Sequence, residues 1–170
     1  MALEGKKVRM FPRPRLDTYL NDHLAGATFG VELTRRARAA NQGTEIGAFL
    51  DGLLAEIVAD KETLETVMER LGVERSPVKP AGAWALEKVG RLKLNGQIRG
   101  YSPLSRLVEL EGLQTGVTGK RSLWEVLSIA LADYERLQDI DFTALLDRAD
   151  RQLSGIAEQR RAAARVALTG

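Results

Sequence analysis

Two stretches of the chain repeat hydrophobic residues at alternating intervals of four and three positions. This spacing places every member of a stretch on one face of an α-helix, the face that packs against neighbouring helices in an antiparallel bundle. The stripes are Ile46, Leu50, Leu53, Ile57, Asp60, Leu64, Val67, Leu71, and Phe142, Leu146, Ala149, Leu153, Ile156, Arg160, Ala163, Ala167. Each contains one charged residue, an acid in the first and a base in the second. The pattern predicts two long helices of one bundle.

Capping residues indicate where the first two helices begin and end. An amphipathic pattern from residue 16 to residue 40 predicts the first helix, and Gly43 follows as a stop signal. Thr44 fits the N-cap of the second helix and Gly72 its C-terminal glycine. Because the connection is short, we expect these two helices to form a hairpin.

The second half of the chain predicts another pair of helices. Ser102 and Pro103 are typical of an N-cap and a first-turn proline. Either Asp139 or Asp141 is expected to start the last helix. The stripe of the earlier helix of this pair is Leu107, Leu110, Gln114, Val117, Arg121, Trp124, Leu127 and Leu131. Residues 73–101 connect the two pairs, with a short helical pattern over residues 81–92.

These elements predict an all-α fold. Two helical hairpins joined by one long crossover that carries a short extra helix form an antiparallel four-helix bundle of the ferritin-like type. Within the 170 residues we expect two parts, a basic N-terminal arm over 1–15 and a single bundle domain over 16–170. No strand pattern is present.

The amino-acid composition excludes several classes of functional site. The chain contains no Cys, which excludes disulfides, thiolate metal sites and thiol redox reactions. It has no apolar run of the roughly 20 residues that span a membrane and no secretory leader pattern, so we expect a cytoplasmic protein. The formal net charge is +2, which does not by itself demand a nucleic-acid partner. No nucleophile-elbow or catalytic-triad spacing supports hydrolase chemistry.

Two short stretches resemble a known family. Residues 19–26, Tyr-Leu-Asn-Asp-His-Leu-Ala-Gly, resemble the start of the first helix of bacterioferritins. Residues 64–72, Leu-Glu-Thr-Val-Met-Glu-Arg-Leu-Gly, resemble the close of the second helix of ferritin-like proteins. The resemblance implies a di-iron centre with one Glu on each of two helices and a Glu-x-x-His motif on each of the other two.

The sequence departs from that ligand set. In the alignment that we favour, Ala27 stands at the first Glu position, and Glu56 is followed three residues later by Ala59 instead of His. The last helix reads Asp-Arg-Ala-Asp over 147–150, and no Glu-x-x-His occurs anywhere in the chain. We therefore expect no resident cofactor and no ferroxidase activity of the usual kind.

Four residues are nevertheless candidate ligands of a degenerate metal site. Glu56 and Asp60 lie four residues apart on one helix, so that both carboxylates can reach one cation. His23, the single His, and Glu111 are candidates to complete it. The alternative for Asp60 is an ion pair with a base such as Arg160 or Arg121, which would fix helix register. The alternative for His23 is a hydrogen-bonded core residue.

Two further features suggest contacts with partners. Gly112, Gly116 and Gly119 interrupt one helix at spacings that indicate close approach by the crossover, a second subunit or a ligand. The basic arm includes Lys6, Lys7, Arg9, Arg13 and Arg15, and with Arg160, Arg161 and Arg165 it is a candidate for phosphate contacts.

Three functions are compatible with these features. The first is a non-enzymatic ferritin-like bundle that acts by self-assembly, as a homodimer, or by binding a partner. The second is a DNA-associated stress-protection protein that uses the basic arm. The third is a degenerate metal-binding or metal-storage protein that uses His23, Glu56, Asp60 and Glu111.

Overall fold

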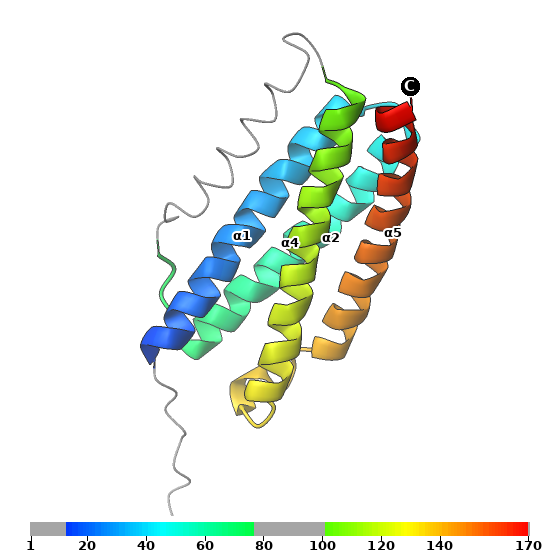
Figure 1. Cartoon of the computed structure of the whole chain (residues 1–170). Coiled ribbons are helices and arrows are strands. Elements are labelled where there is room, and N and C mark those ends of the chain that lie inside the picture. The colour runs from blue at the N-terminus through cyan, green and yellow to red at the C-terminus, as the bar shows by residue number, and fades with distance from the viewer. Residues whose placement is uncertain (1–12, 77–100, 170) are drawn as a thin grey trace, which may run out of the picture.

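The computed structural model describes residues 13–76 and 101–169, and over these ranges the chain is helical without strands. The elements are α1 (Arg13–Ala40), α2 (Glu45–Leu71), α4 (Pro103–Ala130), the 3₁₀ turn η1 (Glu135–Leu137) and α5 (Phe142–Thr169). Figure 1 shows the four long helices side by side in one bundle. The predicted all-α four-helix bundle is confirmed. Among the described helices, none combines the length and the hydropathy needed to cross a membrane.

The helices pack as two hairpins, α1 with α2 and α4 with α5, and α4 also packs along α1 (Figure 1). Ser76 lies near the start of α1, where its backbone N–H donates to Asn21 Oδ1 at 2.7 Å. Tyr101 lies beyond the far end of α1, where its hydroxyl accepts from Asn41 Nδ2 at 2.9 Å. Ser76 and Tyr101, the described residues on either side of the connection, therefore lie toward opposite ends of the bundle, as the predicted crossover requires.

Two predicted segments lie wholly or mostly outside the described residues. The short helix expected over 81–92 falls in the range 77–100, and most of the basic arm falls in 1–12. The helix predicted from residue 16 begins at Arg13, so the last three residues assigned to the arm belong to α1.

Helix termini follow the predicted caps. Thr44, Ser102 and Asp141 each accept, through a side-chain oxygen, the backbone N–H three residues further on. Gly72 has φ 67°, the left-handed conformation that ends α2. Of the two proposed starts for the last helix, Asp141 is the one that caps α5.

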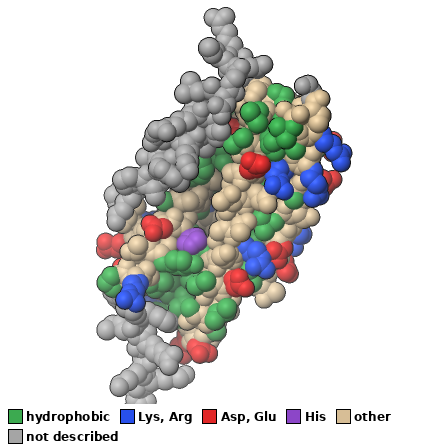
Figure 2. Space-filling model, viewed as in Figure 1, with side chains coloured by type: hydrophobic (Ala, Val, Ile, Leu, Met, Phe, Trp, Pro, Cys, Tyr) green, Lys and Arg blue, Asp and Glu red, His purple; other side chains and the backbone are tan. Residues whose placement is uncertain are grey.

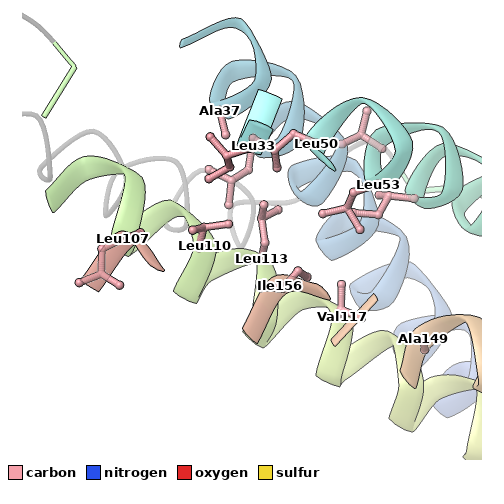
Figure 3. Close-up of a cluster of buried hydrophobic side chains, with 14 residues drawn as sticks. Leu33, Ala37, Leu50, Leu53, Leu107, Leu110, Leu113, Val117, Ala149 and Ile156 are labelled. Atoms are coloured by element: carbon pink, nitrogen blue, oxygen red, sulfur yellow. The ribbon is translucent and has the colours of Figure 1, made fainter. Parts of the chain in front are cut away.

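The core consists of two clusters of buried hydrophobic side chains, one toward each end of the bundle. Figure 3 shows the first, in which leucines of α1, α2 and α4 meet Ala149 and Ile156 of α5. The second is built around Trp124. The predicted stripes miss Leu113, Leu123 and Leu145, which are buried. A strict four-three alternation drifts relative to the 3.6-residue helical period, so neighbouring positions also reach the core.

The glycines of α4 have different surroundings. A Cβ at Gly112 would lie 3.2 Å from Leu33 Cδ2, so α1 itself approaches this position. The expected close approach is therefore present at Gly112, and it comes from α1, which was not among the three expected neighbours. A Cβ at Gly116 or Gly119 would meet nothing within 4 Å among the described residues.

A closer approach occurs at the start of α2. A Cβ on Gly47 would lie 2.1 Å from the carbonyl oxygen of Asn41. That carbonyl also accepts the Thr44 hydroxyl at 2.6 Å, which holds the turn between α1 and α2 against the first turn of α2. Backbone atoms cannot give way as a flexible side chain can, so this hairpin requires glycine at position 47.

We expect Gly47→Ala to destabilise the protein by about 1–3 kcal/mol, because the added methyl group overpacks a fixed backbone. Gly52→Ala is the matched control on the same helix: its Cβ would meet nothing within 4 Å, and it should add about 0.5–1 kcal/mol through helix propensity. Urea unfolding followed by circular dichroism measures both. Equal effects of the two substitutions would contradict the assignment.

Candidate functional site

A buried ion cluster lies where α2, α4 and α5 meet. Asp60 on α2 is only 2% exposed. Lys120 Nζ of α4 donates a hydrogen bond to Asp60 Oδ2, and Arg148 Nε of α5 lies 3.1 Å from Asp60 Oδ1. Asp60 therefore pairs with bases, as one of the two alternatives proposed, but these bases are Lys120 and Arg148. Arg121, which the sequence suggested, pairs with Asp150 at 2.6 Å instead. One carboxylate thus connects three helices.

Gln152 of α5 completes this cluster and is 3% exposed. Its Nε2 donates to Glu56 Oε2 at 2.9 Å and to Asp60 Oδ2 at 3.3 Å, and its Oε1 accepts a hydrogen bond from Lys120 Nζ. Glu56 and Asp60 were predicted to face the same site. Both carboxylates accept hydrogen bonds from the Gln152 amide, so they do lie close together. The cluster balances two carboxylates against two bases.

Burial governs the electrostatics of the cluster. It lowers the pKa of the Lys120 ammonium, and the charge and hydrogen bond of Asp60 oppose that shift. Asp60 Oδ1 is buried and accepts no hydrogen bond, although Arg148 Nε lies close to it as an ion-pair partner. The attraction between the Arg148 guanidinium and Asp60 Oδ1 therefore compensates the burial of this oxygen without a hydrogen bond. Such a cluster fixes helix positions and holds the Asp60 carboxylate away from solvent.

The other two candidate ligands lie elsewhere. The His23 ring packs edge-on against Tyr19, with ring centroids 4.6 Å apart, and is half-buried on α1. Burial lowers the pKa of the His23 imidazole, and the charge of Asp22 opposes the shift. Glu111 is exposed on α4. Across residues 13–76 and 101–169, no three His, Cys, Asp or Glu side chains converge in a way that could hold a metal ion.

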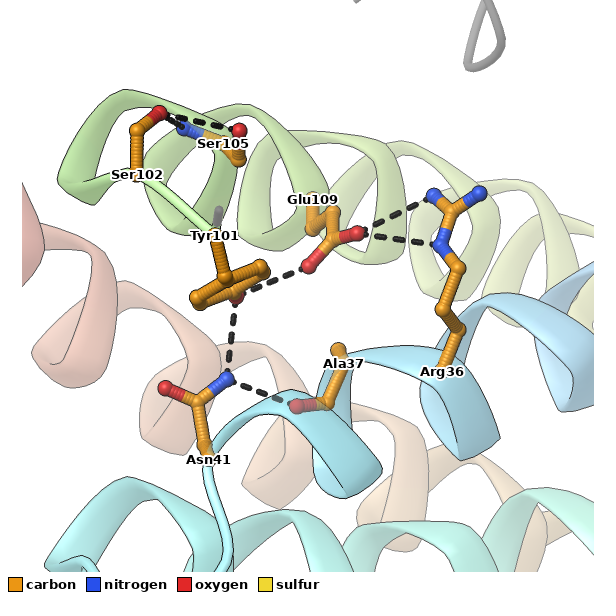
Figure 4. Close-up of polar contacts among 7 residues, drawn as sticks. All are labelled: Arg36, Ala37, Asn41, Tyr101, Ser102, Ser105 and Glu109. Carbon is orange, nitrogen blue, oxygen red and sulfur yellow. Dashed lines mark hydrogen bonds and ion pairs between the residues drawn. The ribbon is translucent and has the colours of Figure 1, made fainter. Parts of the chain in front are cut away.

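A second polar cluster, which sequence reasoning missed, lies at the end of the bundle where α1 stops (Figure 4). Glu109 of α4, 8% exposed, accepts hydrogen bonds from Arg36 Nε at 3.1 Å and from the Tyr101 hydroxyl at 2.8 Å. Asn41, 1% exposed, donates to Tyr101 and accepts from Arg106 Nε at 2.7 Å. These bonds join the turn after α1 to the first turns of α4.

Weak signals for these residues were present in the sequence. Asn41 follows the predicted first helix, two residues before the Gly43 stop signal, and Gln152 and Lys120 each lie one position away from a predicted stripe. A polar residue next to an apolar stripe is common on helix surfaces, so neither position stood out. The side chains of Gln152 and Lys120 are long enough to reach the core from the edge of the stripe.

Comparisons with known proteins add no relative. No family model matches this chain, and neither the curated proteins nor the solved structures compared with it gave a match.

The ion cluster generates a stability prediction. Asp60→Asn leaves Lys120 and Arg148 without their shared carboxylate and should cost about 3–5 kcal/mol. Lys120→Met should cost less, because Arg148 still faces Asp60. Asp51→Asn is the matched control on α2: its ion pair with Arg38 is exposed, so we expect a loss below about 1 kcal/mol. Chemical unfolding measures all three, and a small effect at Asp60 would contradict the assigned role.

The second polar cluster generates a pH prediction. Burial raises the pKa of the Tyr101 phenol from 10.0 to about 12. The folded protein then binds more protons than the unfolded chain between these values, so stability should fall as pH rises from about 10 to about 12. Ultraviolet titration of tyrosinate should show a late transition that Tyr101→Phe lacks. An unchanged titration curve in this variant would contradict the assignment.

Proposed function

We propose that this chain is a ferritin-like bundle without a di-iron type of centre, and that it acts by self-assembly or by binding a partner rather than by catalysis. The observation that carries the proposal is the ion cluster around Asp60. In this cluster Lys120 and Arg148 lie beside Asp60, where a metal cation would have to bind, and the Gln152 amide donates to both Glu56 and Asp60.

The charges of the cluster support this proposal. A divalent ion at Glu56 and Asp60 would have to displace the Lys120 ammonium and remain close to the Arg148 guanidinium. Like charges at such separations repel strongly inside a protein, where screening is weak. The carboxylates are thus used to hold α2 against α4 and α5.

The arrangement of helices supports the ferritin-like part of the proposal. Two antiparallel hairpins, the first leaving the bundle at one end and the second entering it at the other, fit the topology of that class of bundles. The short resemblances at residues 19–26 and 64–72 fall on α1 and across the end of α2. A shared topology supports common architecture and leaves function to be argued from individual surfaces.

The surface supports action through contacts. Five large hydrophobic side chains are exposed on the described residues, at 37–76% of their full accessibility. Grouped exposed apolar residues are typical of protein interaction sites. They are Leu104, Val126, Ile129, Val166 and Leu168.

A metal-retention experiment tests the proposal. After anaerobic loading with Fe(II) or Mn(II) and desalting, we expect mass spectrometry to find no stoichiometric ion in the full chain, because Asp60 is already paired with two bases. The control is the double variant Glu56→Gln and Asp60→Asn, which removes both acids. Retention of roughly one ion per chain that this variant loses, or Fe(II) oxidation above that of the variant, would overturn the proposal.

A further inference from the structure

The face of α4 that is turned away from the core has an unusual distribution of side chains. Its members recur every three or four residues, which places them on one stripe of the helix. They are Leu104, Val108, Glu111, Thr115, Thr118, Ser122, Val126 and Ile129. All are exposed except Val108, which is half-buried. Apolar side chains occupy both ends of this face, which we call the α4 outer face, and small side chains occupy its middle.

Exposure at the two ends of the α4 outer face is high for aliphatic residues. Leu104 is 37% exposed at the start of the helix, and Val126 and Ile129 are 46% and 76% exposed near its end. In Figure 2 hydrophobic side chains gather over the start of α4 and the end of α5, and much of the helix below them is drawn in tan. Glu111 is the one charged member of the stripe.

This pattern is complementary to itself when the helix is reversed. If two copies of α4 pack antiparallel about a point between Thr115 and Thr118, the residues pair by type. Leu104 meets Ile129 of the second copy, and Val108 comes within one position of its Val126. Thr115 meets Thr118, and the Glu111 carboxylate meets the Ser122 hydroxyl. We propose that the α4 outer face is the interface of a two-fold symmetric dimer of this chain, with the two α4 helices antiparallel.

Small side chains in the middle of the face allow the two helices to approach closely. Thr115, Thr118 and Ser122 are exposed there, and a Cβ at the adjacent Gly119 would meet nothing within 4 Å. Helix pairs pack with axes 8–10 Å apart, and the shorter distances require small residues at the crossing point. The midpoint of the self-complementary pattern coincides with this region.

Charge favours the antiparallel orientation. Arg161 and Arg165 are exposed in the last turns of α5, and neither forms an ion pair among the described residues. The end of α5 lies beside the start of α4 (Figure 1). Asp133 and Glu135, in the connection beyond Ile129, are likewise exposed and unpaired there. An antiparallel dimer brings the basic end of each copy to the acidic end of the other. A parallel dimer would bring like charges together.

The size of the face predicts a modest affinity. Leu104 and Ile129 are 25 residues apart, which corresponds to about 37 Å along the helix. One helix width over that length lies at the low end of specific interfaces, so we expect dissociation in the micromolar range. This inference rests on the self-assembly part of the proposed function and specifies its geometry.

The first test measures assembly of the full chain by sedimentation from about 1 to 200 µM. We expect a monomer–dimer equilibrium that Thr118→Glu weakens at least tenfold, because it places two charges at the centre of the interface. Ala55→Glu, at an exposed position of α2, is the matched control and should leave the equilibrium unchanged. A monomer at every concentration, or a dimer equally sensitive to both substitutions, overturns the proposal.

The second test determines orientation and uses the absence of Cys from the chain. A mixture of Leu104→Cys and Ile129→Cys proteins should form a disulfide-linked dimer on mild oxidation. Each variant alone should form at least tenfold less, because identical positions lie far apart in an antiparallel pair. Preferential cross-linking of Leu104→Cys with itself would indicate a parallel pair and overturn the proposal.

These outcomes are separate from those that test the proposed function. A monomer that retains no metal ion overturns the dimer and leaves partner binding by the bundle in place. A metal-retaining, Fe(II)-oxidising dimer overturns the proposed function and leaves the interface in place.

Discussion

The burial of the Asp60 carboxylate is the constraint on which the rest of the structure depends. A charge in the interior is tolerated only where opposite charges and hydrogen bonds compensate the lost solvation. Here the compensation comes from Lys120 on α4 and from Arg148 and Gln152 on α5, while Asp60 itself belongs to α2. A shift of one helix by a turn would leave the carboxylate unpaired, whereas a purely apolar seam would tolerate that shift much better. The cluster therefore defines how the second hairpin is placed on the first.

The Glu109 cluster at the end of the bundle has a similar role between other helices. Arg36 of α1 reaches Glu109 of α4, and Asn41 ties the turn after α1 to Tyr101 and Arg106. The two clusters thus fix α2 to α4 and α5, and α1 to α4. Apolar packing supplies the general attraction between the helices, and these polar contacts select one arrangement from those that the apolar faces permit. Glu56 and Asp60, two of the candidate metal ligands, belong to the first of these clusters.

The sequence predicted the helices and their caps because these depend on local spacing and local hydrogen bonds, as at Thr44, Gly72 and Ser102. It also gave an ion pair with a base as one of two alternatives for Asp60. It did not identify Lys120, because a helical pattern defines the apolar face only to within about one residue, and a long side chain at the edge of that face can turn inward. His23 and Glu111 were candidates to join Glu56 and Asp60, but the rotation of each helix about its axis, which tertiary packing sets, places them elsewhere.

The separation of the clustered residues along the chain has a consequence for the kinetics of folding. Lys120 and Gln152 lie 60 and 92 positions from Asp60, and Glu109 lies 73 positions from Arg36. Each hairpin closes through a short connection, so its own contacts are local and form at little cost in chain entropy. The ion pairs need both hairpins in place and are expected to form after the transition state. Interactions made that late slow unfolding rather than accelerate folding, so the lifetime of the folded bundle depends on them more than its rate of formation does.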